Sequence, residues 1–190
     1  MIDSIAKEVS KEFVPKAPTT LWDDSEWLPI FNIPNKNRGA FAEKWIKQRL
    51  TLEGYKVDKG VPTIANGKKG CDLLVNDTIR VEVKLGFAAK SGNKLCLDSS
   101  IWQHLDETTA DVYVLIGINP DKHLDYHVRR GWRTEHEPYY IIYVTKKELN
   151  RIIEKGKAVK QYDNWQLGGS FLQYVDYGYD MRKFPYSQKV

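Results

Sequence analysis

The chain has 190 residues, of which 42% are hydrophobic and 28% are charged, as in an ordinary globular protein. A chain of this length buries about 70% of the surface that its unfolded form exposes, so it can hold a hydrophobic core without crosslinks. Its 2 cysteines are too few for a disulfide framework or a structural zinc site. The sequence lacks the roughly 18 consecutive apolar residues of a membrane-spanning helix, and residues 1–16 carry three acids where a signal peptide is apolar. We therefore expect a cytoplasmic protein without a membrane partner.

The charge balance is mildly basic, with 29 Lys and Arg against 25 Asp and Glu and a net charge of +4. The excess is local. Residues 84–94 contain three Lys and no acid, and residues 146–160 contain six basic residues and two acids. Such clusters are typical of surfaces that follow a phosphate backbone, although solvated surface is the commoner explanation.

The first third of the chain carries helical patterns. Apolar residues at helical spacing predict an amphipathic helix over residues 1–13. Residues 17–37 are interrupted by three prolines, which predicts irregular structure. A second helix is expected over residues 38–53, with Asn37 as its N-cap and Gly54 just past its end.

The remainder of the chain alternates strand patterns with two helix signals. Five segments have the apolar patterns of strands: 55–57, 71–75, 79–85, 112–118 and 139–144. Capping boxes predict a short helix over residues 100–107 and another helix that opens at Thr145 and ends near Gly156. Residues 165–186 are rich in aromatics and glycine and predict no definite element. The order of elements indicates one mixed α/β or α+β domain around a central sheet.

The strand 79–85 has an apolar face and a polar face. Strand side chains alternate, so Glu82 and Lys84 project from the same side. Any half-solvated strand has two such faces, and the pattern alone indicates no chemistry. Asp72 lies ten residues before Glu82, on the preceding strand. Its position relative to Glu82 is therefore the important question.

The length of the connection between these two strands decides where the Asp72 side chain points. A two-residue loop pairs Asp72 with Val81, on the apolar face, whereas a three-residue loop over residues 76–78 pairs Asp72 with Glu82. We favour the three-residue loop because it also matches Leu73 with Val81, which keeps the apolar set on one side. Both carboxylates then share a face.

Two carboxylates and an ammonium at one edge of a sheet have a definite chemistry. Mg²⁺ prefers oxygen ligands and retains waters, so a carboxylate pair together with a substrate phosphate suits it. A bound metal lowers the pKa of a water and stabilises in-line displacement at phosphorus, while Lys84 would orient that water or offset the developing charge. The pattern indicates hydrolysis of a phosphodiester.

These residues resemble the signature of a known superfamily. Gly70-Cys71-Asp72, nine residues, and then Glu82-Val83-Lys84 resembles the PD-(D/E)xK nucleases, which include type II restriction enzymes and Holliday-junction resolvases. The resemblance covers residues 38–149, with a helix, three strands, a helix and a strand in the superfamily's order. Cys71 stands where the motif has proline, a departure that many members share.

The resemblance implies a restriction-endonuclease-like three-layer core, in which helices flank a central mixed β-sheet. It implies a single nuclease domain over residues 1–190, with a core at 38–149, an N-terminal helical extension at 1–37 and an aromatic-rich C-terminal extension at 157–190. It further implies Mg²⁺ as the cofactor, with Mn²⁺ as a substitute, and double-stranded DNA as the partner of a homodimer.

Two further residues match positions that are polar in the superfamily. Glu43 matches an acidic residue on the helix before the strands, where it would join Asp72 and Glu82 as a metal ligand. A solvated glutamate paired with Lys47 at i+4 is nearly as good an interpretation. Gln103 matches a polar active-site residue on the helix after the lysine-bearing strand, and it serves equally well as the capping partner of Ser100.

The extensions favour a type II restriction-type enzyme over a structure-specific one. They supply material for target recognition, namely Trp22, Trp27, Trp132, Trp165, Arg129, Arg130 and Arg133. The alternatives are a junction resolvase or repair nuclease, and a non-catalytic DNA-binding module in which Asp72, Glu82 and Lys84 form a surface strip of ion pairs. We expect no catalytic or metal-binding role for the remaining polar candidates: His123, His127, Ser170 and Cys96.

Overall fold

The computed structural model describes residues 2–15, 25–61, 70–91, 94–97, 110–118, 139–155, 159–161, 164–166 and 183–187. The described helices are α1 (Ser4–Ser10), α2 (Leu28–Phe31), α3 (Asn35–Leu52) and α5 (Lys146–Glu154). The described strands are β1 (Val57–Lys59), β2 (Leu73–Val75), β3 (Ile79–Ser91), β4 (Lys94–Leu97), β5 (Val112–Ile118), β6 (Tyr139–Thr145), β7 (Val159–Gln161) and β8 (Asn164–Gln166).

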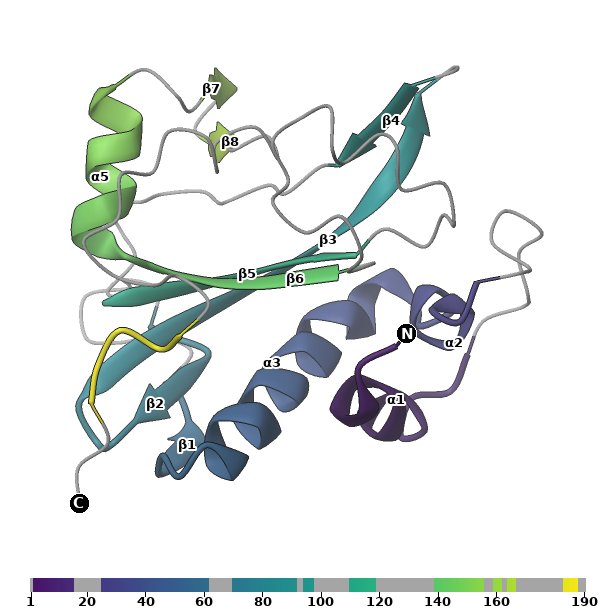
Figure 1. Cartoon of the computed structure of the whole chain (residues 1–190), viewed down its shortest axis with the longest axis horizontal. Coiled ribbons are helices and arrows are strands. Elements are labelled where there is room, and N and C mark those ends of the chain that lie inside the picture. The colour runs from purple at the N-terminus through teal and green to yellow at the C-terminus, as the bar shows by residue number, and fades with distance from the viewer. Residues whose placement is uncertain are drawn as a thin grey trace.

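The fold is α+β, with a mixed sheet flanked by helices (Figure 1). The strand order is β1-β2-β3-β5-β6, and β4 pairs with the far end of β3. β3 and β5 run parallel, whereas the other neighbouring pairs are antiparallel. β7 and β8 form a separate antiparallel pair. The helices α1, α2 and α3 lie on one side of the sheet and α5 lies on the other (Figure 1).

The core occupies both faces of the sheet. Every residue of β5 is buried, because this strand lies between β3 and β6 and is covered from both sides. The face toward α3 buries these residues among others: Val81, Val83, Val112, Val114, Phe41, Trp45 and Ile46. The face toward α5 buries a second set: Tyr113, Leu115, Ile142, Val144, Leu149 and Ile152. We call these the α3 face and the α5 face.

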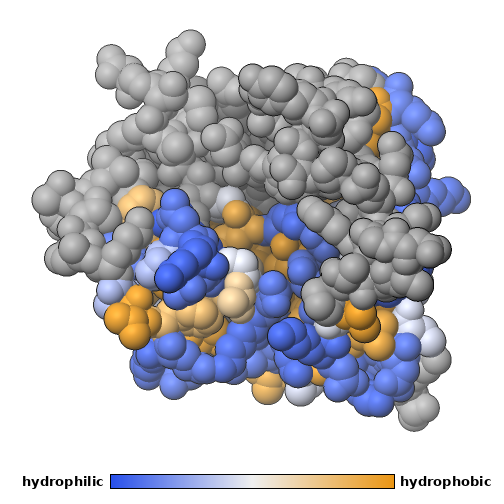
Figure 2. Space-filling model, turned by 180° about the vertical axis from the view of Figure 1, so that it is seen from behind, coloured by the Kyte–Doolittle hydropathy of each residue, from blue (hydrophilic) through white to orange (hydrophobic). Residues whose placement is uncertain are grey.

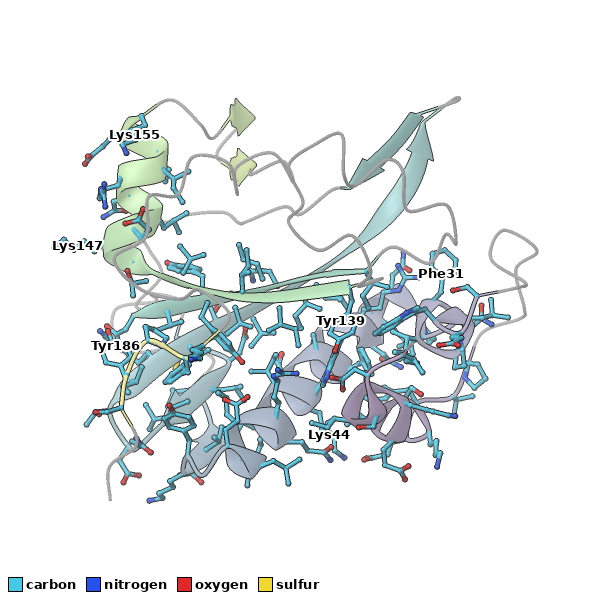
Figure 3. All side chains as sticks on the ribbon, in the orientation of Figure 1. Phe31, Lys44, Tyr139, Lys147, Lys155 and Tyr186 are labelled. Atoms are coloured by element: carbon cyan, nitrogen blue, oxygen red, sulfur yellow. The ribbon has the colours of Figure 1, made fainter. Side chains whose placement is uncertain are left out.

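The carboxylate of Asp3 joins three elements of the α3 side. It caps the first turn of α1 by accepting hydrogen bonds from two backbone amides of that turn. It also accepts from Trp45 Nε1 on α3 and from the Tyr139 hydroxyl on β6, both at 3.0 Å, and from the Arg49 guanidinium at 3.3 Å. Figure 3 shows Tyr139 between the sheet and these helices. Asp3 therefore fixes the N-terminal helix to α3 and the sheet.

The surface of the described residues is mostly hydrophilic. Figure 2 shows hydrophilic residues across much of the described part of one face, with smaller hydrophobic patches between them. Figure 3 shows Lys147 and Lys155 projecting from the outer side of α5. None of the described helices combines the length and the apolarity that crossing a membrane requires.

Most of the expected elements are present, but several boundaries differ. β5 matches its expected bounds, and α5 opens at Thr145, whose hydroxyl accepts from the Glu148 amide as the capping box predicts. The strand expected at 55–57 lies two residues later, and β3 runs six residues beyond 85. The helix expected at 100–107, together with Gln103, lies outside the described residues.

The start of the second expected helix was wrong. α3 begins at Asn35, not Arg38, and Pro34 stands at its N-cap position where we expected Asn37. Proline suits this place because the first turn does not need its missing amide hydrogen. The short helix α2 also lies within the segment expected to be irregular. Arg38 donates to the carbonyls of Phe31 and Ile33, which satisfies the end of α2.

One residue proposed for target recognition belongs to the core instead. The Trp27 side chain is only 2% exposed, and its ring packs against those of Trp45 and Tyr139 at centroid distances of 6.0 Å and 5.0 Å. The physical reason is that the N-terminal segment covers the α3 face, where a large ring contributes most as buried area. Trp22, Trp132 and the three arginines lie outside the described residues.

Asp3→Ala should destabilise the protein by roughly 3 kcal/mol, because it removes an N-cap and leaves buried donors without an acceptor. Urea unfolding at pH 7 measures this change. Glu8→Ala is the matched control, since Glu8 lies on the same helix with a 68% exposed side chain and pairs only with Lys11 among the described residues. Equal stability of the two variants would contradict the role given to Asp3.

Candidate active site

The connection between β2 and β3 sets the register on which the site depends. Leu73 pairs with Val81 and Val75 pairs with Ile79, so the connection has three residues, 76–78. Asn76 and Asp77 adopt left-handed φ values of 48° and 63°, which these two residue types tolerate better than most. The expected register is confirmed from Leu73 to Val75, and Asp72 stands directly before the first paired residue of β2.

The side chain of Asp72 is fixed against the edge of β3. β2 begins at Leu73, and the amide of the preceding residue, Asp72, donates to the Val81 carbonyl at 3.0 Å. Asp72 Oδ2 then accepts from the Val83 amide at 2.7 Å, which is the next donor of β3 on that side. The carboxylate thus takes the place of a backbone carbonyl just before β2 begins, and this bond holds it next to Glu82.

Glu82 and Lys84 lie on the α5 face of β3. The register with β5 places them beside Tyr113 and Leu115, respectively. The Lys84 ammonium donates to Glu82 Oε1. The two side chains are only 13% and 27% exposed, so this is a partly buried ion pair and not a solvated one. Such a pair is desolvated, and its charges act strongly on neighbouring groups.

Glu43 approaches the same group from the opposite layer. It lies on α3 and is half-buried, and the charges of Lys59, Glu82 and Lys84 all act on its pKa. Burial is the main cause of the raised pKa of Glu43, and the Glu82 carboxylate raises it further. Glu43 forms no ion pair with Lys47 within the described structure. The alternative of a solvated i, i+4 pair is therefore not what the structure contains.

The pKa of Asp72 reports how closely these groups lie together. Burial raises it from 3.8 to about 6, and the Glu82 carboxylate is the next largest cause. The bond from the Val83 amide and the charge of Lys84 act in the opposite direction, and Glu43 raises the pKa again. Four of the five expected site residues therefore belong to one cluster: Glu43, Asp72, Glu82 and Lys84. We call this the carboxylate cluster.

Sequence reasoning missed Gly60, which follows β1. Its amide donates to the Asp72 carbonyl at 2.8 Å, and a Cβ at this position would lie 2.0 Å from the Cys71 carbonyl oxygen. No side chain fits there without moving the backbone that carries Asp72. A glycine directly after a strand is a signal for such a close approach.

The donors of the cluster suit a hard cation. Within the described residues, no three His, Cys, Asp or Glu side chains are already arranged to hold a metal ion. Mg²⁺, however, commonly takes one or two carboxylates and completes its shell with waters and substrate phosphate. Asp72 keeps one carboxylate oxygen beyond its bond to Val83. Asp72 and Glu82 thus fit Mg²⁺ by chemistry, and their sharing of one ion, with Glu43 as a third ligand, stays a prediction.

No family model, curated protein or solved structure matches the chain. Membership of the PD-(D/E)xK superfamily therefore stays a prediction that rests on the motif residues and their arrangement.

The raised pKa of Asp72 predicts a stability that falls as pH rises. Between pH 3.8 and about 6 the folded state holds a proton that the unfolded state has lost, so the free energy of unfolding decreases through this window. At about 1.4 kcal/mol per pKa unit, ionised Asp72 costs roughly 3 kcal/mol above pH 6. Asp72→Asn keeps an acceptor for Val83, and it should raise the free energy of unfolding at pH 7.5 by up to this amount in EDTA.

Urea unfolding from pH 4 to pH 8 measures this effect. Asp77→Asn is the matched control, because Asp77 lies in the same hairpin with a 62% exposed side chain. Its pH dependence should equal that of the wild type. If Asp72→Asn shows the wild-type slope as well, then the environment assigned to Asp72 is incorrect.

Gly60→Ala should disturb the site through the backbone. The new Cβ has to displace Cys71 and Asp72, which should cost roughly 1–3 kcal/mol of stability. Gly39→Ala is the control, since Gly39 lies within α3 and a Cβ there meets no atom within 4 Å. That change should be neutral or stabilising. Thermal unfolding of both variants distinguishes a steric constraint from a general intolerance of substitution.

Proposed function

We propose that the protein is a Mg²⁺-dependent DNA endonuclease of the PD-(D/E)xK type. The observation that supports this proposal is that Asp72, Glu82 and Lys84 lie together at the start of β2, with Glu43 on α3 near enough for the charges of Glu82 and Lys84 to act on its pKa. Carboxylate ligands next to an ammonium are what hydrolysis of a phosphodiester needs. Mn²⁺ is expected to substitute for Mg²⁺.

Each side chain of the cluster has a distinct task in this proposal. Asp72 and Glu82 would hold the metal, which supplies a water of lowered pKa and neutralises charge on the phosphate. Lys84 orients the attacking water and stabilises the negative charge that develops as the water adds to phosphorus and the ester P–O bond breaks. Glu43 adds a further carboxylate beside the pair.

Restriction-type cleavage of double-stranded DNA by a homodimer is the form that we propose first. Because Trp27 and α1 belong to the core, the N-terminal extension offers less material for target recognition than its sequence indicated. That observation favours the second candidate, a junction resolvase or repair nuclease with a compact core. Incubation with plasmid DNA and with a four-way junction, in Mg²⁺ and then in EDTA, separates the two.

The plasmid assay has three informative outcomes. Discrete fragments in Mg²⁺ but not in EDTA support a restriction-type enzyme. Selective cutting of the four-way junction supports the resolvase. Intact DNA in every condition, together with undetectable Mg²⁺ binding, would leave the non-catalytic module in which Glu82 and Lys84 are a structural ion pair.

Lys84→Ala should lower the cleavage rate by roughly 10²–10³-fold while duplex affinity stays close to that of the wild type. The reason is that the ammonium acts on the developing charge and not on docking. Asp72→Ala and Glu82→Ala should lose cleavage and also weaken Mg²⁺ binding. Single-turnover cleavage, calorimetric Mg²⁺ titration and a duplex-binding assay measure these three quantities.

Lys56→Ala is the matched control for Lys84→Ala. Lys56 also forms an ion pair, with Asp77 at 2.6 Å, but at the opposite end of the β2–β3 hairpin and on the exposed surface. Its removal should leave the rate within a few-fold of the wild type. Near wild-type cleavage by Lys84→Ala would remove Lys84 from the mechanism, and the same result for all three cluster variants would overturn the nuclease proposal.

A further inference from the structure

A second lysine, Lys59, lies beside the carboxylate cluster. Lys59 is the last residue of β1, and its register partner on β2 is Leu73, the neighbour of Asp72. The next residue, Gly60, donates its amide to the Asp72 carbonyl at 2.8 Å. The backbone at Lys59 is thereby tied to the backbone that carries the first carboxylate of the site.

The side chain of Lys59 belongs to the same face as Glu43. Val57 and Lys59 share a face of β1, since strand side chains alternate, and buried Val57 is part of the core that α3 covers. Glu43 lies on α3. The charge of Lys59 is the largest single charge that acts on the pKa of Glu43, ahead of those of Glu82 and Lys84. The two observations agree in placing Lys59 beside Glu43 on the α3 face, whereas Glu82 and Lys84 project from the α5 face.

Lys59 differs from the neighbouring lysines in what it contacts. Lys84 is paired with Glu82 and mostly buried, and Lys56 is paired with Asp77 and Asp58. Lys59 is exposed and forms no ion pair or side-chain hydrogen bond within the described part of the chain. Within the described residues, its ammonium is therefore not held by another side chain.

An available ammonium next to carboxylates suits one kind of ligand. A cluster of carboxylates repels the phosphates on either side of a bond that is to be cut, and a flanking cation offsets this repulsion. A lysine serves this purpose as a point charge that binds a phosphate oxygen without a fixed geometry. An ammonium cannot act as a ligand for a metal ion, because both are positively charged.

We propose that Lys59 binds a backbone phosphate of the DNA next to the bond that the carboxylate cluster cleaves. This inference rests on the proposed nuclease function and adds a substrate-binding residue to it. Lys59 contributes to docking the duplex, whereas Lys84 contributes to the chemical step.

The test compares three variants with the wild type: Lys59→Ala, Lys59→Arg and, as a matched control, Lys7→Ala. Lys7 is also exposed and without an ion pair in the described structure, but it lies on α1. Fluorescence anisotropy of a labelled 25-bp duplex in EDTA gives the affinity over a series of salt concentrations. Steady-state cleavage in Mg²⁺ gives kcat and KM, and thermal unfolding confirms that each variant is folded.

Lys59→Ala should weaken duplex binding about tenfold and reduce the slope of log affinity against log salt by about 1, because one phosphate contact is lost. Its KM should rise while its kcat stays within a few-fold. Lys59→Arg should restore affinity, and Lys7→Ala should match the wild type.

The outcomes separate this inference from the function on which it rests. If the wild type cleaves but Lys59→Ala binds with the affinity and salt slope of Lys7→Ala, the inference fails and the nuclease proposal stands. A loss of kcat at unchanged affinity overturns the inference too, as does a failure of Lys59→Arg to restore binding. If duplex binding depends on Lys59 but no cleavage occurs in Mg²⁺, the phosphate contact stands and the nuclease proposal fails. Absence of duplex binding by the wild type overturns both.

Discussion

The three-residue connection between β2 and β3 is the constraint on which the candidate site depends. A shift of one residue would exchange the two faces of β2 and carry Asp72 away from Glu82. Asn76 and Asp77 accept left-handed backbone angles, and Asn76 is tied to Lys56 by its amide and by its side-chain oxygen. The turn is therefore held by its own conformation and by the strand beside it. Because β2 begins only at Leu73, the Val83 amide binds the Asp72 carboxylate and not a backbone carbonyl of β2.

The carboxylate cluster opposes folding. Glu43 and Asp72 both have raised pKa values, which means that burial and mutual repulsion disfavour their charged forms. The fully buried strand β5 and the apolar layers on both of its faces supply the stability that offsets this cost. Functional sites commonly combine strained charge with a rigid surrounding structure in this way. A divalent cation would relieve the repulsion between these carboxylates. The charges that lower the stability of the fold are therefore the ones that the proposed activity would use.

The sequence was most informative where one physical signal dominated. The continuous apolar run predicted β5, the capping residue predicted the start of α5, and the alternation of Leu73 and Val81 decided the β2–β3 register. Predictions failed where tertiary packing decided. Trp27 looks like a surface aromatic in sequence, yet it fills the core beside Trp45. The roles of Gly60 and Lys59 could not be predicted from the sequence, because both depend on the pairing of β1 with β2. No local pattern shows which distant backbone a glycine will approach.

The hydrogen bonds of Asp3 have a consequence for the order of folding. They join residues that lie 42 and 136 positions apart in the chain, at Trp45 and Tyr139. Such contacts contribute only after the intervening chain has already been brought together, and their loop-closure cost comes first. The helix that Asp3 caps has seven residues, too few to persist alone in water. We therefore expect the N-terminal helix to acquire its structure by docking onto an assembled sheet, late in folding.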